Sequence, residues 1–209
     1  MQSDSMIFAG VELSSGRKPV TFAALDDDLN IKTLEKCDIP TALAYLQEYE
    51  RICVVINISA ARSIQSAYVD FKSQMTQSGI KSFSKKDSAK QWFETKSQVC
   101  FRIFVEQTLL PQRTLEGRLQ RALILYERGL RIDDPMDIFE EITRYKLRQG
   151  IFPTENIYAS KELDALMAAY LAWMGINRPA QIVVRGGYVL PEQVQNFLLN
   201  ENLPEVLDE

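Results

Sequence analysis

The sequence of 209 residues predicts an α/β fold: a mixed five-stranded sheet with helices on both faces and a small C-terminal hairpin. Short β-branched or alternating apolar runs recur five times before residue 107, which indicates strands. Segments with helix start and stop signals separate the later runs and follow the last one. A nearly all-apolar helix at 160–175 is typical of a helix surrounded by protein, as in a sheet covered by helices.

The N-terminal part is predicted to form a three-stranded meander. Its turns carry the Gly, Pro, Asp and Asn residues that favour chain reversal. The strands are expected at 7–13, 20–25 and 31–36. A helix then begins at Pro40, just after Asp38, and runs to Tyr49.

The parallel part of the sheet is predicted to follow this helix. The run 51–58 is almost continuously apolar, which is typical of a central strand covered on both faces. A second strand is expected at 99–106, after a helix at 60–77. The remaining elements are helices and a final hairpin, expected at 114–128, 133–149, 160–175 and 181–191.

The helix predicted at 160–175 contains one acidic residue within an otherwise apolar run. Ser160 is the expected N-cap, Glu162 suits the positive first turn, and Gly175 ends the helix. Between Leu163 and Met174 every residue except Asp164 is apolar. A buried carboxylate needs donors or a cation. Asp164 therefore either accepts backbone N–H groups at the helix start or belongs to a polar site.

Composition predicts one soluble domain at 6–199, with mobile tails at 1–5 and 200–209. Apolar content of 46% and charged content of 25% are ordinary for a globular protein. No apolar run approaches the ~20 residues of a membrane span, and the start lacks a signal-peptide pattern, so we expect a cytoplasmic protein without a membrane partner. The three cysteines are far apart and are expected in the core. Nothing in the sequence indicates the oligomeric state.

The chain contains no histidine, which excludes Ser-His-Asp and Cys-His nucleophiles and histidine zinc sites. Catalysis would have to use carboxylates, Lys, Tyr or Cys, with or without a hard metal ion. The net charge of −4 means that attraction to nucleic acid needs a local basic patch.

One such patch is suggested between residues 79 and 98. This segment has five lysines, Lys85 and Lys86 among them, against two acids. Phe83, Trp92 and Phe93 lie among them. The segment could grip a nucleic-acid backbone and stack on bases. The alternative is a solvated segment whose aromatic side chains turn inward.

Polar residues stand near the ends of three predicted strands: Glu12, Asn57 and Glu106. The carboxyl ends of parallel strands share one edge of a sheet, where open α/β sheets bind ligands. Asp164 joins them if its helix begins at that edge. Three carboxylates and an amide suit magnesium or manganese. Such ions support phosphoryl displacement without histidine.

The element order resembles the ribonuclease H-like fold, and several phrases resemble the family catalogued as domain of unknown function 429, described as predicted ribonuclease H-like nucleases. These phrases lie at 8–12, 55–59, 102–106, 114–121 and 162–166. The resemblance implies that Glu12, Glu106 and Asp164 are metal ligands and that Asn57 is a weak ligand or positioning group. Glu12 replaces the family's Asp, and Asn57 replaces an acid, so the resemblance supports the fold more than the activity.

Three functions follow from this interpretation. The first is metal-dependent hydrolysis of phosphodiesters in nucleic acid, with Glu12, Asn57, Glu106 and Asp164 at the site and phosphate contacts from Arg118, Arg121, Lys85 and Lys86. The second is an inactive module that binds nucleic acid or protein. The third is nucleotide-dependent phosphoryl transfer, which the lack of a Gly-rich phosphate loop between the first strands disfavours. Whether the chain is an enzyme stays open at this stage.

Overall fold

The computed structural model describes residues 6–58, 64–83, 89–105, 107–141, 148–150 and 157–192. A mixed six-stranded sheet has the order β3-β2-β1-β4-β6-β5. Its strands are β1 Ile7–Leu13, β2 Val20–Leu25, β3 Ile31–Cys37, β4 Ile52–Asn57, β5 Lys81–Ser82 and β6 Lys90–Thr95. β2 runs antiparallel to β1 and β3, whereas β4 and β6 run parallel to β1 and β5 runs parallel to β6. The predicted α/β class and meander are confirmed, with one strand more than expected.

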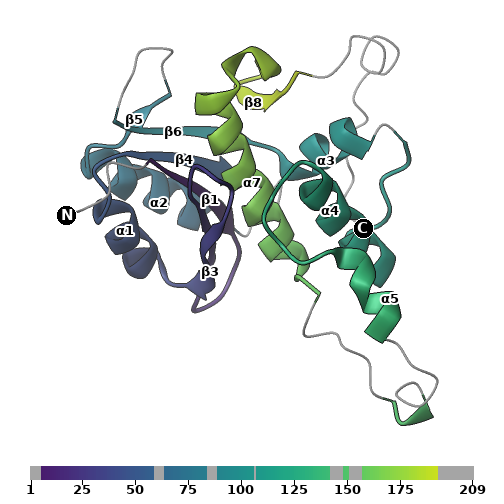
Figure 1. Cartoon of the computed structure of the whole chain (residues 1–209). Coiled ribbons are helices and arrows are strands. Elements are labelled where there is room, and N and C mark those ends of the chain that lie inside the picture. The colour runs from purple at the N-terminus through teal and green to yellow at the C-terminus, as the bar shows by residue number, and fades with distance from the viewer. Residues whose placement is uncertain are drawn as a thin grey trace.

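Helices cover both faces of the sheet (Figure 1). α1 Ile39–Gln47 and α2 Gln65–Gln77 pack on one face, and α7 Ser160–Asn177 packs on the other. Beside α7 lie α3 Ser97–Val105 and α4 Leu115–Glu127. The 3₁₀ turn η2 Pro135–Asp137 packs against α4 and leads into α5 Ile138–Glu141. A second 3₁₀ turn, η4 Pro179–Gln181, leads to the predicted hairpin, which is formed by β7 Ile182–Arg185 and β8 Tyr188–Pro191.

Side-chain caps fix two helix starts where the sequence predicts them. Asp38 Oδ1 accepts the backbone N–H of Thr41 at 2.9 Å and caps α1. Thr114 Oγ1 accepts the N–H of Gly117 at 3.0 Å and caps α4. Each cap satisfies a donor that the first turn of a helix leaves free.

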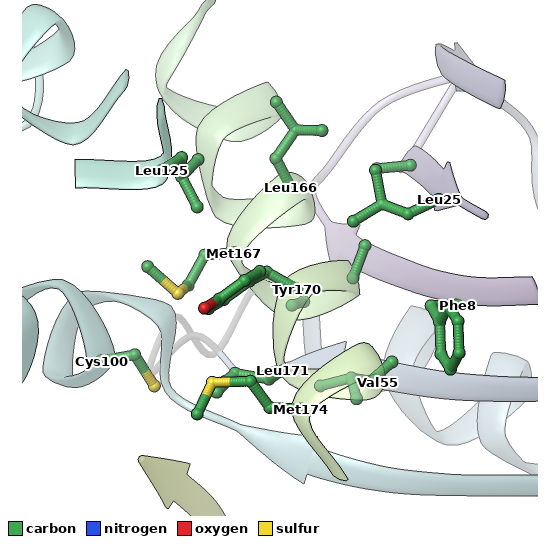
Figure 2. Close-up of a cluster of buried hydrophobic side chains, with 14 of the residues drawn as sticks. Phe8, Leu25, Val55, Cys100, Leu125, Leu166, Met167, Tyr170, Leu171 and Met174 are labelled. Atoms are coloured by element: carbon green, nitrogen blue, oxygen red, sulfur yellow. The ribbon is translucent and has the colours of Figure 1, made fainter. Parts of the chain in front are cut away.

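α7 forms the centre of one hydrophobic core. Figure 2 shows its side chains between sheet residues such as Phe8 and Val55 and residues of α3 and α4 such as Cys100 and Leu125. The helix touches the sheet backbone at Gly10, where a Cβ atom would lie 1.9 Å from the carbonyl oxygen of Ala165. Only glycine permits this approach. The prediction that this helix is surrounded by protein is confirmed.

The strand predicted at 99–106 is wrong, because residues up to Val105 form α3. Its buried side chains, Ser97, Cys100, Phe101 and Phe104, recur at the helical spacing of three to four residues. The next strand of the sheet comes instead from the lysine-containing segment. In β6, Trp92 and Phe93 are 7% and 4% exposed, so neither ring is available for stacking on a base. The inward-facing alternative is the correct one for these two aromatics.

Several sequence-based predictions lie outside the described residues. They concern Glu106, Lys85, Lys86, both tails and the segment 142–147 within the helix predicted to end at 149. Cys37, Cys53 and Cys100 are free and buried, as expected of core residues. In the part of the chain that the structure describes, no helix combines the length and apolar character of a membrane span.

Candidate functional site

A single row of paired residues crosses the sheet at the carboxyl ends of β1, β4 and β6. We call it the strand-end row, and it consists of Lys36, Thr21, Glu12, Asn57 and Thr95. Paired residues in neighbouring strands direct their side chains to the same face. That face is the one covered by α7, because Gly10, two residues before Glu12, contacts α7. Glu12 and Asn57 are therefore neighbours under the start of this helix.

Asn57 is bonded at both ends of its side-chain amide. Its Nδ2 group donates to Glu12 Oε2 at 2.5 Å, and its Oδ1 atom accepts the backbone N–H of Ser97 at 2.7 Å. The amide thus joins β1 to the first residue of α3. An aspartate here could accept from Ser97 but could not donate to Glu12, so the amide suits a site in which Glu12 needs a donor.

Asp164 lies in the first part of α7 and is 4% exposed. Gln98 Nε2 donates to its Oδ1 atom at 2.6 Å, and Gln112 Nε2 donates to its Oδ2 atom at 2.5 Å. Its backbone carbonyl accepts the hydroxyl of Ser97 at 2.9 Å. Asp164 is therefore part of a polar cluster of side chains, and the donors are side-chain amides, in place of the backbone amides of the helix start.

The predicted cap of α7 is wrong in its detail. Ser160 is the first residue of the helix, Ala159 is the N-cap, and the Ser160 hydroxyl donates to the carbonyl of Gln112 at 2.9 Å. Glu162 accepts the backbone N–H of Ala159 at 2.7 Å, which satisfies one free donor. Ser160 is thus used to hold the segment that carries Gln112 against Asp164.

Burial governs the electrostatics of the two acids. Burial, and after it the nearby carboxylate of Asp164, raise the pKa of Glu12 to about 8, while the Asn57 amide and Lys161 oppose the rise. Burial also raises the pKa of Asp164 to about 6, against the hydrogen bonds from Gln98 and Gln112 and the charges of Arg121 and Lys161. Near neutral pH, Asp164 is charged and Glu12 keeps its proton.

Arg121 is a buried cation next to this cluster and is hydrogen-bonded to Gln98. It is 2% exposed, and its guanidinium donates to the carbonyls of Leu110 and Gly117 and to Gln98 Oε1, at 3.0, 2.8 and 2.7 Å. Gln98 therefore connects the cation to Asp164 through one amide. The prediction that Arg121 contacts phosphate does not fit this structure, because its guanidinium is buried and bonded to protein groups. Arg118 is half-buried, and its Nε group is buried without a partner among the described residues.

The site offers oxygen atoms to a hard cation from two acids and several amides. No set of three His, Cys, Asp or Glu side chains within the described ranges is placed to hold a metal ion, and Glu106 lies outside these ranges. Glu12 and Asp164 are the available carboxylates, and rotated amides of Asn57, Gln98 or Gln112 could add oxygen ligands. An all-oxygen set fits magnesium or manganese better than zinc or copper.

Sequence reasoning missed Ser97, Gln98 and Gln112. The helical spacing of buried residues in 97–104 could have shown that a helix, with Ser97 and Gln98 in its first turn, follows the strand end. Gln112 lies in the loop before the Thr114 cap, and nothing in the local sequence marks it. The open surface hollows along α2 lie on the other face of the sheet and are lined by neither acid.

Comparisons of this chain with protein-family models, with curated proteins and with solved structures find no match. The polar cluster around Glu12 and Asp164 is therefore the feature of the molecule from which we infer its function.

Proposed function

We propose that this chain is a ribonuclease H-like protein that binds magnesium or manganese at Glu12 and Asp164 and hydrolyses phosphodiester bonds in nucleic acid. One observation carries the proposal. Two buried carboxyl groups lie close enough for the charge of Asp164 to raise the pKa of Glu12, and within the described residues no Lys or Arg is hydrogen-bonded to either. Ionising both groups brings two negative charges together, and a divalent metal ion would supply a compensating cation.

The strand order supports the proposal. The meander β3-β2-β1 followed by the parallel strands β4 and β6 is the order expected of a ribonuclease H-like sheet. In the resemblance described above, acidic positions lie on the first strand, at the end of the fourth, on the last helix and at Glu106, which lies outside the described residues. Glu12, Asn57 and Asp164 are the residues of this chain at the other three positions, and all three belong to one polar cluster.

Each polar group then has a role around the acids. Asn57 holds the carboxyl group of Glu12, while Gln98 and Gln112 fix the orientation of Asp164. The charge of Arg121 favours the charged form of Asp164, and its guanidinium also holds Gln98 in place. A bound divalent ion would activate water and stabilise the charge on the phosphate. Because Glu12 must lose its proton to act as a ligand, activity is expected to rise with pH toward about 8.

Hydrolysis assays test this function directly. We expect the wild-type chain with manganese to cleave at least one member of a panel of single-stranded DNA, RNA, duplex DNA and RNA–DNA hybrid. Asp164→Asn and Glu12→Gln should each reduce the rate at least about 100-fold, in line with the loss of a group that acts on charge in the reaction. Glu35→Gln, which changes an exposed acid, is the control and should leave the rate unchanged. Equal cleavage by wild type and Asp164→Asn would contradict the proposal.

A second candidate is an inactive module that binds nucleic acid. It is favoured by one observation: the carboxylate oxygens of Asp164 and the Oε2 atom of Glu12 already accept amide donors. This candidate predicts that the wild type binds oligonucleotides equally well with manganese and with a chelator and cleaves none of the panel.

A further inference from the structure

We infer that the edge of the sheet around Glu12 carries a basic track that binds the backbone of an extended nucleic-acid strand. The basic track consists of five exposed cations from four parts of the chain: Arg17, Lys18, Lys36, Lys96 and Lys161. The inference rests on the proposed function and deepens it, because it makes the substrate a polymer with several phosphates, as opposed to a single nucleotide.

The strand pairing places two of these cations on either side of the acids. Lys36 is paired with Thr21, which is paired with Glu12, so Lys36 lies in the strand-end row two strands away. Lys96 follows Thr95 of the same row and precedes Ser97, whose N–H binds Asn57. Both lysines are exposed. They therefore flank the site on opposite sides.

The other cations lie at the same edge. Arg17 and Lys18 are exposed in the turn after β1, which is closed by the Ser14 N–H bonded to the Pro19 carbonyl at 2.7 Å. Lys161 is exposed in the first turn of α7, and its charge acts on both Glu12 and Asp164. An anion that approaches the acids would meet these cations first.

Both ends of the sheet carry exposed cations, and Lys32 and Arg51 lie at the end opposite the buried acids. The opposite end carries three consecutive acids in the turn between β2 and β3, at residues 26–28. The exposed acids near Lys36 are Glu35 and Asp38, and Asp38 is engaged in capping α1. The edge with the buried acids thus has, in a chain of net charge −4, a local group of exposed cations that would attract a polyanion.

The C-terminal hairpin fixes one end of the track. Thr95 Oγ1 donates to the carbonyl of Val189 at 2.7 Å, which holds β8 against the end of β6. The Lys96 ammonium lies 4.6 Å from the centroid of the Tyr188 ring. This cation–π contact keeps a flexible lysine at the rim of the site. Tyr188 is therefore a positioning residue for Lys96.

The length of the track favours a polymer. From β3 to β6 the sheet spans four strand spacings, or about 19 Å at about 4.8 Å each. Even an extended strand, whose phosphates are farther apart than the about 3.4 Å of a strand in duplex DNA, would place several phosphates over this distance. A mononucleotide could contact only one end of the track.

Binding measured by fluorescence anisotropy tests the track without any hydrolysis. The full chain is titrated into a labelled single-stranded oligonucleotide long enough to span the track, in a chelator and at several salt concentrations. Lys36→Gln and Lys96→Gln should each weaken binding several-fold and make the slope of log affinity against log salt less steep by about 0.7. Lys32→Gln is the matched control, since Lys32 is an exposed lysine at the other end of β3, and it should change neither quantity.

Two variants at one position test the role of Tyr188. Tyr188→Leu should reproduce the loss seen with Lys96→Gln, and Tyr188→Phe, which keeps the ring, should retain wild-type affinity. No binding by the wild type at low salt, or equal losses from Lys32→Gln and Lys36→Gln, would overturn the track. Because the assay contains no metal ion, a failure of the track leaves the metal site standing. A failure to hydrolyse leaves the measured binding unchanged.

Discussion

The carboxyl group of Glu12 has the most unusual environment of any single residue at the site. It is 5% exposed, faces the charge of Asp164, and has one hydrogen-bond donor, the Asn57 amide, among the described residues. Burial raises its pKa from 4.5 to about 8. The folded chain therefore holds a proton that the unfolded chain releases in mild acid.

This proton makes stability depend on pH in a defined direction. Between pH 4.5 and about 8 the folded state binds more protons than the unfolded state, so the free energy of unfolding falls as pH rises through this window. One proton gives at most about 1.4 kcal/mol per pH unit. Urea unfolding from pH 5 to pH 8.5 should show this fall in the wild type. In the Glu12→Gln variant the free energy of unfolding should stop falling above about pH 6, where the contribution of Asp164 ends. Parallel curves for the two proteins would contradict the assignment.

Asn57 decides how much negative charge the site holds. Asn57→Asp would remove the donor to Glu12 and add a third acid beside it. We expect a lower melting temperature in a chelator, because of charge repulsion, and a larger stabilisation by manganese than in the wild type. Differential scanning calorimetry with and without manganese measures both. Asn57→Ala is the control. It should have a lower melting temperature than the wild type in a chelator, and manganese should stabilise it no more than it stabilises the wild type. An Asn57→Asp variant that responds to manganese no more than Asn57→Ala would contradict the metal site.

Single polar residues within apolar runs were the predictable part of the site. Glu12 and Asn57 end apolar strands and Asp164 interrupts an apolar helix, so the sequence predicts a polar site where the strand ends and the start of that helix meet. Gln98 and Gln112 are ordinary polar residues outside such runs, and only the folded chain shows that both reach Asp164. Partners of this kind depend on loop paths that local patterns do not encode.

At the scale of elements, the contact between β1 and α7 sets the position of the acids. The helix backbone lies against Gly10, so Asp164 reaches the strand-end row next to Glu12. The close approach restricts position 10 to glycine, because any side chain there would meet the carbonyl oxygen of Ala165.

Gly10→Ala should therefore destabilise the protein by about 3 kcal/mol or more, since the backbone of a packed helix must shift to admit the methyl group. Gly175→Ala, in α7 itself, is the matched comparison. There the new Cβ would lie 3.3 Å from the rim of the Phe93 ring, and alanine favours the helix, so its stability should stay within about 1 kcal/mol of the wild type. Urea unfolding of the two variants measures the difference. Equal effects would contradict the proposed contact.

Two neighbouring elements show why the sequence misassigned part of the sheet. The segment 99–105 is rich in Val, Ile and Phe, which favour strands, but its buried positions recur with a helical period. The segment 90–95 contains Lys, Gln and Glu, which are uncommon in buried strands, yet it forms a strand whose middle residues, Trp92 and Phe93, are buried. Tertiary packing against α7 and β4 overrides composition in both cases.

Across the whole molecule, the fold class was predictable because the order of elements limits the ways in which a sheet can be covered. The site was predictable only in part, since its acids come from opposite ends of the chain and meet where α7 crosses β1. The placement of Lys36 and Lys96 on either side of the acids depends on the pairing of strands, which local patterns do not reveal.

The most direct test of the central claim is the binding of manganese to the metal-free chain, measured by isothermal titration calorimetry at pH 8.5, where both acids can ionise. We expect a saturable binding event in the wild type that weakens as the pH is lowered to 5.5, with release of protons on binding. The double variant Glu12→Gln, Asp164→Asn should not bind, and Glu35→Gln should bind as the wild type does. An isotherm that is the same for the wild type and the double variant would contradict the claim that Glu12 and Asp164 hold a metal ion.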